Sequence, residues 1–336
     1  MAIVAGIDLG GTAVNYTLLD TASGQFLIEG LCEHPALVSH GPDVCLRQIA
    51  DGLAMTARRA GTALGDIVAV GLDTPGPASA DGVISSKGST NFSQEAWRGY
   101  DFRGALEERI GLPVIYNNDG NAAALYAHFV HFGPRANDHS SVSAIVGTGL
   151  GGGVIESGRV VKGAAGMAGE LGHVHLPMHG LLEADQPVPK CNCGFEGDAE
   201  SVASLTGISR NLLPYWVTRF PGHELGQVGS LEKAAKMARG YGERGDTLAL
   251  KVFEQQAKAL GRLFTIAANF TDPHVYFIGG GVVETGPEFR HWFLGKVREH
   301  TLLRSEQAAV ASIALVPDLD MAGARGAAVA ALASLG

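Results

Sequence analysis

Hydrophobic and polar positions along the chain predict strands and helices in two successive groups. Two short runs rich in apolar and β-branched residues flank Gly10-Gly11-Thr12, which is typical of a β-hairpin with a glycine turn. Apolar residues at helical spacing follow, and they lead into a second short apolar run. The first group is a hairpin over 3–9 and 14–19, a helix over 43–63, a strand over 67–72, a helix over 102–110, a strand over 113–116 and a helix over 121–131.

The same order begins again in the second half of the chain. The second group is a strand over 142–146, a glycine turn over 147–153, a returning strand from Val154, a helix over 246–269, a strand over 274–278, a helix over 287–300 and a strand over 312–316. Two similar units in series predict a duplicated α/β architecture. We expect a first domain over 1–118, a second over 119–321, and a closing helix over 322–336 that packs back on the first. A site near Asn117–Gly120 would then lie in a cleft between the domains.

Composition narrows the classes of function. With 46% hydrophobic and 18% charged residues, the 336-residue chain has the composition of a compact protein of two domains. A net charge of −9 argues against a nucleic-acid partner, which needs a basic face. The four cysteines, two of them one residue apart, do not form the pattern of a secreted disulfide scaffold. Without a targeting segment or a long apolar run, we expect a soluble cytoplasmic protein with no membrane partner.

Two glycine turns are candidate phosphate sites. Consecutive N–H groups in such turns form a concave anion site, and both Gly10-Gly11-Thr12 and Gly147-Thr148-Gly149 have the residues for one. The alternative is that each is only a tight hairpin turn. Their occurrence at corresponding points of the two groups favours phosphate. A third cluster, Gly279-Gly280-Gly281, either lets an adenosine approach the backbone or is a plain strand-to-helix turn.

Two other nucleotide-binding patterns bear on these glycines. No stretch matches the P-loop pattern GxxxxGK[ST]. Residues 147–152 do match GxGxxG, with Glu170 near the distance of a ribose-binding acid, and this leaves a nicotinamide-dependent oxidoreductase as one alternative. A dinucleotide fingerprint opens a helix, however, whereas these glycines lead into a predicted strand.

Polar residues at the end of the strand over 113–116 point to acid–base chemistry. Asn117-Asn118-Asp119-Gly120-Asn121 includes more Asn and Asp than a helix N-cap requires, although capping alone is the alternative. In phosphoryl transfer, a positioned Asp orients the attacking hydroxyl and accepts its proton, and Asp119 is the candidate for this role.

A histidine, two cysteines and a carboxylate follow. His173, Cys191, Cys193 and Asp198 have the donor atoms for a tetrahedral Zn²⁺ site that would brace a loop. The alternative is a pair of free thiols among solvated polar groups, and substitute ligands are available at 175 and 179.

These motifs, in this order, resemble the ROK family (repressor, open reading frame, kinase), and the resemblance covers nearly the whole chain. The matching segments are Gly6-Ile-Asp-Leu-Gly-Gly-Thr12, Asn118-Asp-Gly-Asn-Ala-Ala123, Gly147-Thr-Gly-Leu-Gly-Gly-Gly153, Gly169-Glu-Leu-Gly-His173 and Cys191-Asn-Cys-Gly-Phe-Glu-Gly-Asp198. The resemblance implies the two-domain actin-like ATPase (ribonuclease H-like) duplicated fold with an interdomain cleft. One position departs from the family pattern Cys-x-Cys-Gly-x-x-Gly-Cys, because Asp198 stands where the third cysteine would be.

The resemblance also implies an activity and its residues. We expect an ATP-dependent kinase of a glucose-like hexose, acting at the C6 hydroxyl with Asp119 as general base. Asp8 would help to hold Mg²⁺ through water, and the phosphates and nucleotide would contact the three glycine clusters. The expected sugar ligands are Asn91, Asn118, Asp119, Glu170, His173 and Glu200; the expected nucleotide residues are Asp8, Gly10, Gly11, Thr12, Gly147, Thr148, Gly149, Gly280 and Gly281; and the expected zinc ligands are His173, Cys191, Cys193 and Asp198. We expect a homodimer.

The sequence leaves several functional alternatives open. The acceptor could be another sugar, such as fructose, mannose or N-acetylmannosamine, and the donor could be polyphosphate. The chain could instead be a sugar-responsive ROK regulator, although Asp8 lies too near the start of the sequence for a preceding helix-turn-helix domain. A sugar-binding protein without catalytic activity is a further alternative.

Overall fold

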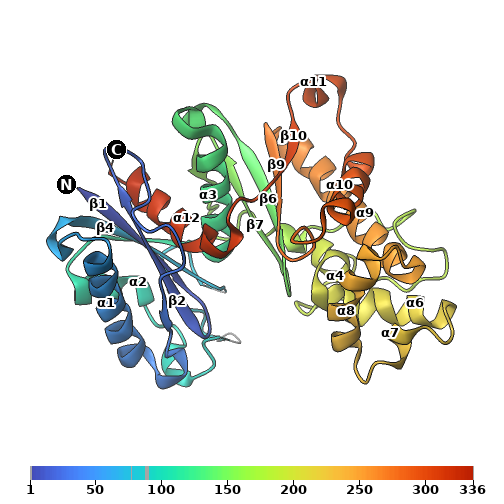
Figure 1. The fold of residues 1–336 in the computed structure, drawn as a ribbon, viewed down its shortest axis with the longest axis horizontal. Coiled ribbons are helices and arrows are strands. Elements are labelled where there is room, and N and C mark those ends of the chain that lie inside the picture. Colours follow the sequence, from blue (N-terminus) through green and yellow to red (C-terminus); the bar gives the residue numbers. More distant parts are fainter. Residues whose placement is uncertain (1, 77, 88–90, 336) are drawn as a thin grey trace. The chain divides into compact units, whose positions relative to one another are not determined.

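The computed structural model describes residues 2–76, 78–87 and 91–335, and it divides into two compact units (Figure 1). The first unit comprises Met1–His139, Gly153–Gly169 and Val316–Gly336, and the second comprises Ser140–Gly152 and Glu170–Leu315. The domain limits expected from the sequence stay a prediction, which limited proteolysis would test.

The first unit is built on a five-stranded sheet of order β3-β2-β1-β4-β5. Its strands are β1 (Ile3–Leu9), β2 (Ala13–Asp20), β3 (Glu33–Pro35), β4 (Ile67–Thr74) and β5 (Val114–Asn118). The first two form the expected antiparallel hairpin, whereas β1, β4 and β5 are parallel. Its helices are α1 (Pro42–Arg59), α2 (Phe102–Ile110), α3 (Asp119–Phe132) and α12 (Leu319–Ala333).

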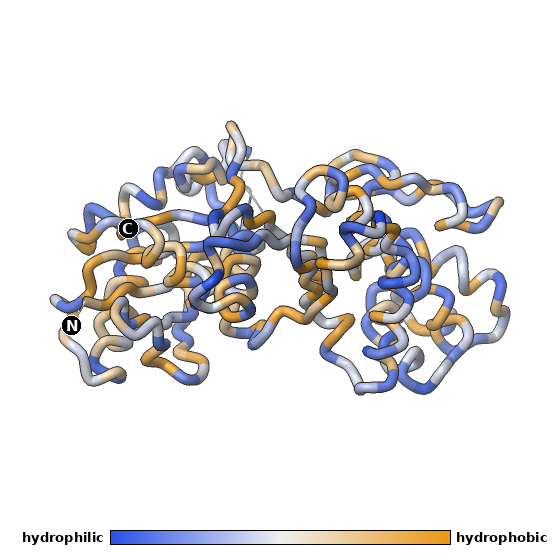
Figure 2. The backbone as a smooth tube through the Cα atoms, turned by 90° about the horizontal axis from the view of Figure 1, so that it is seen from above, coloured by the Kyte–Doolittle hydropathy of each residue, from blue (hydrophilic) through white to orange (hydrophobic). Residues whose placement is uncertain are grey.

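Side chains of β1 alternate between two cores, as expected for a strand covered on both faces. Ile3, Ala5 and Ile7 belong to one apolar core, whereas Val4 belongs to a second core that includes residues of α3 and α12. Along the backbone, hydrophobic stretches (orange) near the N-terminus are bounded by hydrophilic ones (blue), as Figure 2 shows. The residues of β1 at positions 4, 6 and 8 therefore share the face on which α12 packs.

Glycines allow α12 to approach this sheet closely. A Cβ atom at Gly6 would lie 1.8 Å from the carbonyl oxygen of Ala324, and one at Gly71 would lie 1.8 Å from that of Ala327. Within α12 itself, a Cβ at Gly326 would lie 1.7 Å from the carbonyl oxygen of Ala122 in α3. Only glycine leaves room for these backbone contacts.

The second unit is built on a sheet of order β10-β9-β6-β7-β8. Its strands are β6 (Ser141–Val146), β7 (Leu150–Glu156), β8 (Arg159–Val160), β9 (Val275–Gly279) and β10 (Ser312–Leu315), of which β8 and the end of β7 are counted with the first unit. Its helices are α4 (Ala199–Ala203), α5 (Leu205–Gly207), α6 (Leu213–Arg219), α7 (Glu224–Gln227), α8 (Leu231–Glu243), α9 (Thr247–Thr271), α10 (Pro287–His300) and α11 (Ser305–Ala308).

The structure corrects the sequence interpretation at two places. The glycine turn after β6 is short, because β7 begins at Leu150 rather than at Val154. Between 199 and 243, the chain forms helices that the sequence interpretation did not predict: α4, a continuous helical segment over 205–219 in which a π-helical turn (Ile208–Leu212) joins α5 and α6, then α7 and α8. In the part of the chain that the structure describes, none of the helices has the length and apolar character needed to cross a bilayer.

Candidate active site

The first glycine turn lies at the tip of the β1–β2 hairpin. The Gly10 N–H donates a hydrogen bond to the Ala13 carbonyl at 2.8 Å, and Gly11 and Thr12 are exposed. A Cβ at Gly11 would lie 2.4 Å from Oδ1 of Asn91, so the predicted sugar ligand Asn91 lies directly beside this turn. The structure therefore brings two predicted site residues together in the first unit.

The Asn-Asp pair lies where β5 passes into α3. The Asn118 side chain accepts a hydrogen bond from the Asn121 N–H at 2.8 Å and so caps the helix. The Asp119 carboxylate accepts one from the Gly120 N–H at 2.7 Å, and the residue is exposed. Because Asn118 already supplies the cap, capping alone does not explain Asp119.

A buried carboxylate that the sequence interpretation missed lies beside Asp8. Asp73 in β4 is paired in register with Asp8 in β1, and its side chain is fully buried. Burial raises the pKa of Asp8, and burial together with the negative charge of Asp8 raises the pKa of Asp73 well above its ordinary value. In the sequence, Asp73 is a polar residue directly after the apolar run 67–72. Taken by itself, such a residue indicates only the end of a strand.

The second glycine turn is braced by the helix that follows the cysteine loop. The Gly147 N–H donates to the Gly149 carbonyl at 2.9 Å. The Leu205 N–H donates to the Gly147 carbonyl at 3.0 Å, and both the N–H and the hydroxyl of Thr206 donate to the Thr148 carbonyl. With its carbonyl groups bonded in this way, the turn is held in one conformation.

The structure rejects the dinucleotide interpretation of these glycines. They lead from β6 into β7 and not into a helix. The dinucleotide fingerprint needs a helix N-terminus at this point to hold the pyrophosphate, so GxGxxG here is a strand-to-strand turn.

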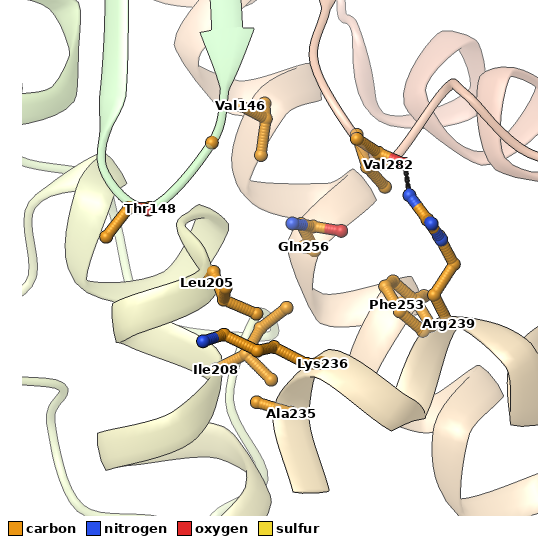
Figure 3. A pocket seen from close by; sticks show the side chains of 12 residues that line it. Val146, Thr148, Leu205, Ile208, Ala235, Lys236, Arg239, Phe253, Gln256 and Val282 are labelled. Carbon is orange, nitrogen blue, oxygen red and sulfur yellow. Dashed lines mark hydrogen bonds between the residues drawn. The ribbon is translucent and has the colours of Figure 1, made fainter. Parts of the chain in front are cut away.

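A pocket of about 300 Å³ opens beside the second turn, within the second unit. Figure 3 shows Thr148 at the tip of the turn, with Gln256 and Val282 facing the same space. The pocket is lined by Val146, Gly147, Thr148, Leu205, Ile208, Ala235, Lys236, Arg239, Phe253, Gln256, Gly281 and Val282. Most of these residues were not predicted, because they come from short helices and helix faces that carry no motif.

The predicted residues Gly280 and Gly281 differ in their roles. Gly280 has a φ of +97°, and a Cβ there would lie 2.0 Å from the Val146 carbonyl oxygen. Packing against β6 therefore explains why residue 280 is a glycine. Gly281 lines the pocket, and its carbonyl accepts a hydrogen bond from the Arg239 guanidinium at 2.7 Å.

Three predicted sugar ligands lie in the second unit. Glu170 is exposed, and His173 is half-buried in the turn that follows it. The Glu200 carboxylate accepts a hydrogen bond from the Leu150 N–H at 2.9 Å through Oε2, and its Oε1 lies 3.4 Å from the Cys191 sulfur. Glu200 is thus held between the second turn and the cysteine loop.

The four predicted zinc ligands form one cluster. One donor atom from each of His173, Cys191, Cys193 and Asp198 lies within 4.8 Å of the others. Asp198 Oδ2 lies 3.1 Å from His173 Nδ1 and 3.7 Å from the Cys193 sulfur. Ligands of a tetrahedral zinc ion, at about 2.0–2.3 Å from the metal, are separated by about 3.3–3.8 Å, so the most distant donor atoms would move inward by about 1 Å around an ion.

Asp198 faces both the cluster and the N-terminus of α4. Its Oδ2 faces the histidine and the cysteines, whereas its Oδ1 accepts a hydrogen bond from the Ser201 N–H at 2.9 Å and caps α4. The side chain is fully buried. The histidines at 175 and 179, considered as substitutes, are not members of the cluster.

Comparisons with known proteins agree with this architecture. The model of the ROK family matches residues 4–334. The glucokinase of Halalkalibacterium halodurans is 33% identical over 289 residues, which cover 84% of this chain and 81% of that protein. The crystal structure of a ROK hexokinase from Thermus thermophilus has a TM-score of 0.76 at 28% identity and covers 99% of both chains.

A second solved structure is a ROK family glucokinase from Streptomyces griseus in complex with glucose and AMPPNP. It has a TM-score of 0.70 at 26% identity and covers 100% of both chains. The two mixed sheets with their helices match these structures, which confirms the actin-like ATPase fold class expected from the sequence. The chain belongs to the ROK family.

Proposed function

We propose that this protein is a sugar kinase that transfers the terminal phosphoryl group of ATP to a glucose-like hexose. The observation that carries the proposal is the braced glycine turn with its adjoining pocket in a chain 33% identical to a glucokinase. The Streptomyces griseus relative was solved with both glucose and an ATP analogue, which supports the same pair of substrates here.

The nucleotide base would occupy the pocket beside the second turn. Phe253, Ile208 and Val282 supply apolar surface for a base, and Gln256 supplies a polar group. The Oε1 atom of Gln256 is buried and accepts no hydrogen bond from the described residues. A side-chain movement toward the pocket would present it to an amino group such as the one on adenine. The phosphates would contact N–H groups of the turns at Gly10–Thr12 and Gly147–Gly149 other than those of Gly10 and Gly147, which are bonded within the turns.

Asp119 would act on the acceptor sugar. Its carboxylate is exposed at the N-terminus of α3, where it is accessible to a hydroxyl group. In this role it orients the C6 hydroxyl toward the terminal phosphorus and accepts the proton that the hydroxyl loses. Hydrogen-bonding groups for the other hydroxyls would come from Asn91, Asn118, Glu170, His173 and Glu200.

Magnesium and zinc would have separate roles. A bound magnesium ion supplies positive charge at the phosphates during transfer. Asp8 would hold this ion through water, and its oxygen donors suit a hard cation. Zinc would be held by His173, Cys191, Cys193 and Asp198 and would fix the loop that precedes Glu200. His173 faces this cluster through Nδ1, which leaves Nε2 for a sugar hydroxyl.

We also propose that the protein works as a homodimer in the cytoplasm. All four cysteines are free, which suits a reducing compartment. Phe270, Leu302 and Val310 are exposed apolar side chains of the second unit that a second copy would cover. Light scattering after size-exclusion chromatography would give the mass, and a strictly monomeric protein would contradict the dimer.

A coupled assay over a panel of sugars and phosphoryl donors tests the activity. We expect ATP-dependent phosphorylation of glucose or a close relative, and kcat lower by about 10²–10⁴-fold in Asp119→Ala, the contribution typical of a general base. Asp51→Asn, an exposed acid on α1, is the matched control and should retain activity. Absence of turnover with every sugar would contradict the proposed kinase activity. A wild-type kcat in Asp119→Ala would contradict the role of Asp119 as general base.

A further inference from the structure

Strand β5, which leads into the candidate general base Asp119, lies at an edge of the first sheet. The Val70 N–H of β4 donates a hydrogen bond to the Pro113 carbonyl at 2.9 Å, so alternate residues from 113 onward direct their backbone groups toward β4. Val114 and Tyr116, which lie between them, direct theirs to the open side of the sheet. These groups need partners from outside the sheet, because a buried backbone group without a partner is costly.

Two side chains supply partners on this open side. The Glu107 carboxylate of α2 accepts a hydrogen bond from the Val114 N–H at 3.0 Å. The Lys162 ammonium group, from the segment after β8, donates one to the Tyr116 carbonyl at 3.0 Å. The edge of β5 therefore has one side-chain partner at its start and a second one close to Asp119.

Tyr116 is also fixed through its own side chain, which is 4% exposed. Its hydroxyl shares a hydrogen bond of 2.8 Å with the Thr74 hydroxyl. A Cβ at Gly82 would lie 2.9 Å from Cγ of its ring, so the loop that contains Gly82 packs against the ring. Of these three contacts, the one from Lys162 is made to the backbone, which continues into Asp119.

Lys162 begins a closed turn that ends at Ala168. The Lys162 carbonyl accepts a hydrogen bond from the Ala168 N–H at 3.1 Å, and Gly163 and Gly166 have φ values of +72° and +76° within the turn. A Cβ at Gly166 would lie 2.6 Å from the backbone nitrogen of Ala80, so the turn packs against this part of the first unit. The backbone of Lys162 is therefore held in place where its side chain extends to β5.

The charge of Lys162 is used at some cost. Its side chain is half-buried, and its partner is a neutral carbonyl group rather than a carboxylate. Burial lowers the pKa of Lys162, an effect that the charge of Asp81 partly offsets. An apolar residue would avoid this cost, but it would leave the Tyr116 carbonyl without this donor. The contact therefore indicates that a hydrogen-bond donor is needed at this end of β5.

We propose that Lys162 is a positioning residue for phosphoryl transfer, which holds the backbone at the end of β5 and thereby fixes the direction of the Asp119 carboxylate. Lys162 contacts neither the sugar nor ATP in this scheme. A misplacement of about 1 Å at a reacting group can lower a rate by about 100-fold, so a contact this close in sequence to the base matters for turnover. The effect on turnover rests on the proposed function, whereas the effect on the strand does not.

Steady-state kinetics test the effect on turnover. We expect Lys162→Met to lower kcat by about 10- to 100-fold and to leave the KM for ATP unchanged, since the proposed nucleotide pocket lies in the second unit. Lys162→Arg keeps a donor and should recover most of the kcat. Glu107→Met removes the partner at the other end of the same edge, so it should lower the Tm by about 2–4 °C, as Lys162→Met does, but retain the wild-type kcat.

Three kinetic results would overturn the proposal. The first is a wild-type kcat in Lys162→Met, and the second is an equal loss of kcat in Glu107→Met, which would show a general effect of strand stability. The third is a loss in Lys162→Arg as large as that in Lys162→Met, which would show that the donor is not what matters.

Hydrogen exchange of the substrate-free protein provides a measurement that does not depend on activity. The N–H groups of Gly120 and Asn121 donate to side chains of the segment that follows β5, so their exchange reports how well this segment is held. We expect faster exchange here in Lys162→Met and wild-type exchange in Lys162→Arg and Glu107→Met. Unchanged exchange in Lys162→Met would overturn the positioning role. An inactive wild type would contradict the kinase instead, and the exchange rates would still decide whether Lys162 holds this segment.

Discussion

The carboxylate of Glu200 accepts a hydrogen bond from the backbone N–H of Leu150 at 2.9 Å. Leu150 directly follows the glycine turn Gly147–Gly149, and a Cβ at Gly149 would lie 2.7 Å from the same carboxylate oxygen. The other oxygen of Glu200 lies 3.4 Å from the Cys191 sulfur. One side chain therefore connects the candidate zinc cluster with the turn that would bind phosphate.

Substitution of Glu200 should weaken the use of both ATP and the hexose. We expect Glu200→Ala to lower kcat/KM by about 10- to 100-fold, since it leaves the Leu150 N–H without its acceptor at a cost of about 1–3 kcal/mol. Glu200→Gln keeps an acceptor oxygen and should lose less. Glu196→Gln, an exposed acid on the same loop, is the control for steady-state kinetics. Unchanged values for ATP and hexose in Glu200→Ala would contradict the structural role.

The zinc cluster predicts about one zinc per chain by elemental analysis of purified protein. Cys191→Ser should remove the metal, and Cys32→Ser, which changes a buried thiol elsewhere, should retain it. Metal-free wild-type protein with full activity and an unchanged Tm would show that the cluster is not a required zinc site.

Two variants of Asp198 separate its cap of α4 from its proposed role as a zinc ligand. Asp198→Asn keeps an oxygen for the Ser201 N–H and should preserve the cap of α4, while it removes the charged zinc ligand. Asp198→Cys supplies a thiolate for zinc but no capping oxygen. We expect zinc affinity to rise in the cysteine variant and fall in the asparagine variant, with metal-free stability lower by about 1 kcal/mol in the cysteine variant. A chelator competition and a denaturant titration measure the two quantities, and the reverse order of affinities would refute Asp198 as a ligand.

The pocket makes a prediction about nucleotide choice. If Gln256 Oε1 accepts a hydrogen bond from the adenine amino group, wild type should use ATP better than GTP, whose base has a carbonyl at that position. Gln256→Met should raise the KM for ATP by about fivefold, because one hydrogen bond contributes about 1 kcal/mol net. The KM for the hexose should not change. Equal ATP-to-GTP preference in wild type and variant would exclude this contact.

The close packing of α12 predicts a large difference between two glycine-to-alanine substitutions in helices. Gly326→Ala places a methyl group 1.7 Å from the Ala122 carbonyl oxygen, and we expect a loss of about 1–3 kcal/mol or more in the free energy of unfolding. Gly295→Ala in α10 meets no atom within 4 Å and should stabilise by about 0.5–1 kcal/mol. Urea titration of both variants gives the comparison, and equal stability would contradict the packing.

The sequence predicted those parts of the site that are carried by local motifs. Asp119 and the turn at Gly147–Gly149 could be found because backbone geometry and capping require particular residue types over a few positions. The cluster of His173, Cys191, Cys193 and Asp198 could be expected because these residue types are chemically distinctive. These features depend little on how distant segments pack.

Asp73 and Gln256 could not be found in this way. Asp73 stands out only because it is paired in register with Asp8, and β2, β3 and α1 separate the two residues in the sequence. Gln256 lies in the middle of α9, and only the fold brings it beside the turn after β6. A single polar residue in an apolar stretch is common, and its unsatisfied oxygen becomes visible only when its neighbours are known. Among the helices between 199 and 243, α4 and α7 are too short to show a periodic pattern, and the π-helical turn at Ile208–Leu212 shifts the periodicity of the segment over 205–219.

The position of α12 has a consequence for protein synthesis. This helix fills the glycine-lined face of β1 and β4, yet the whole second unit separates it from them in the sequence. A ribosome therefore exposes the first sheet long before the helix that covers it is made. During this interval the apolar side chains around Val4 are uncovered, and we expect the nascent first unit to depend on chaperones until Leu319–Ala333 has emerged.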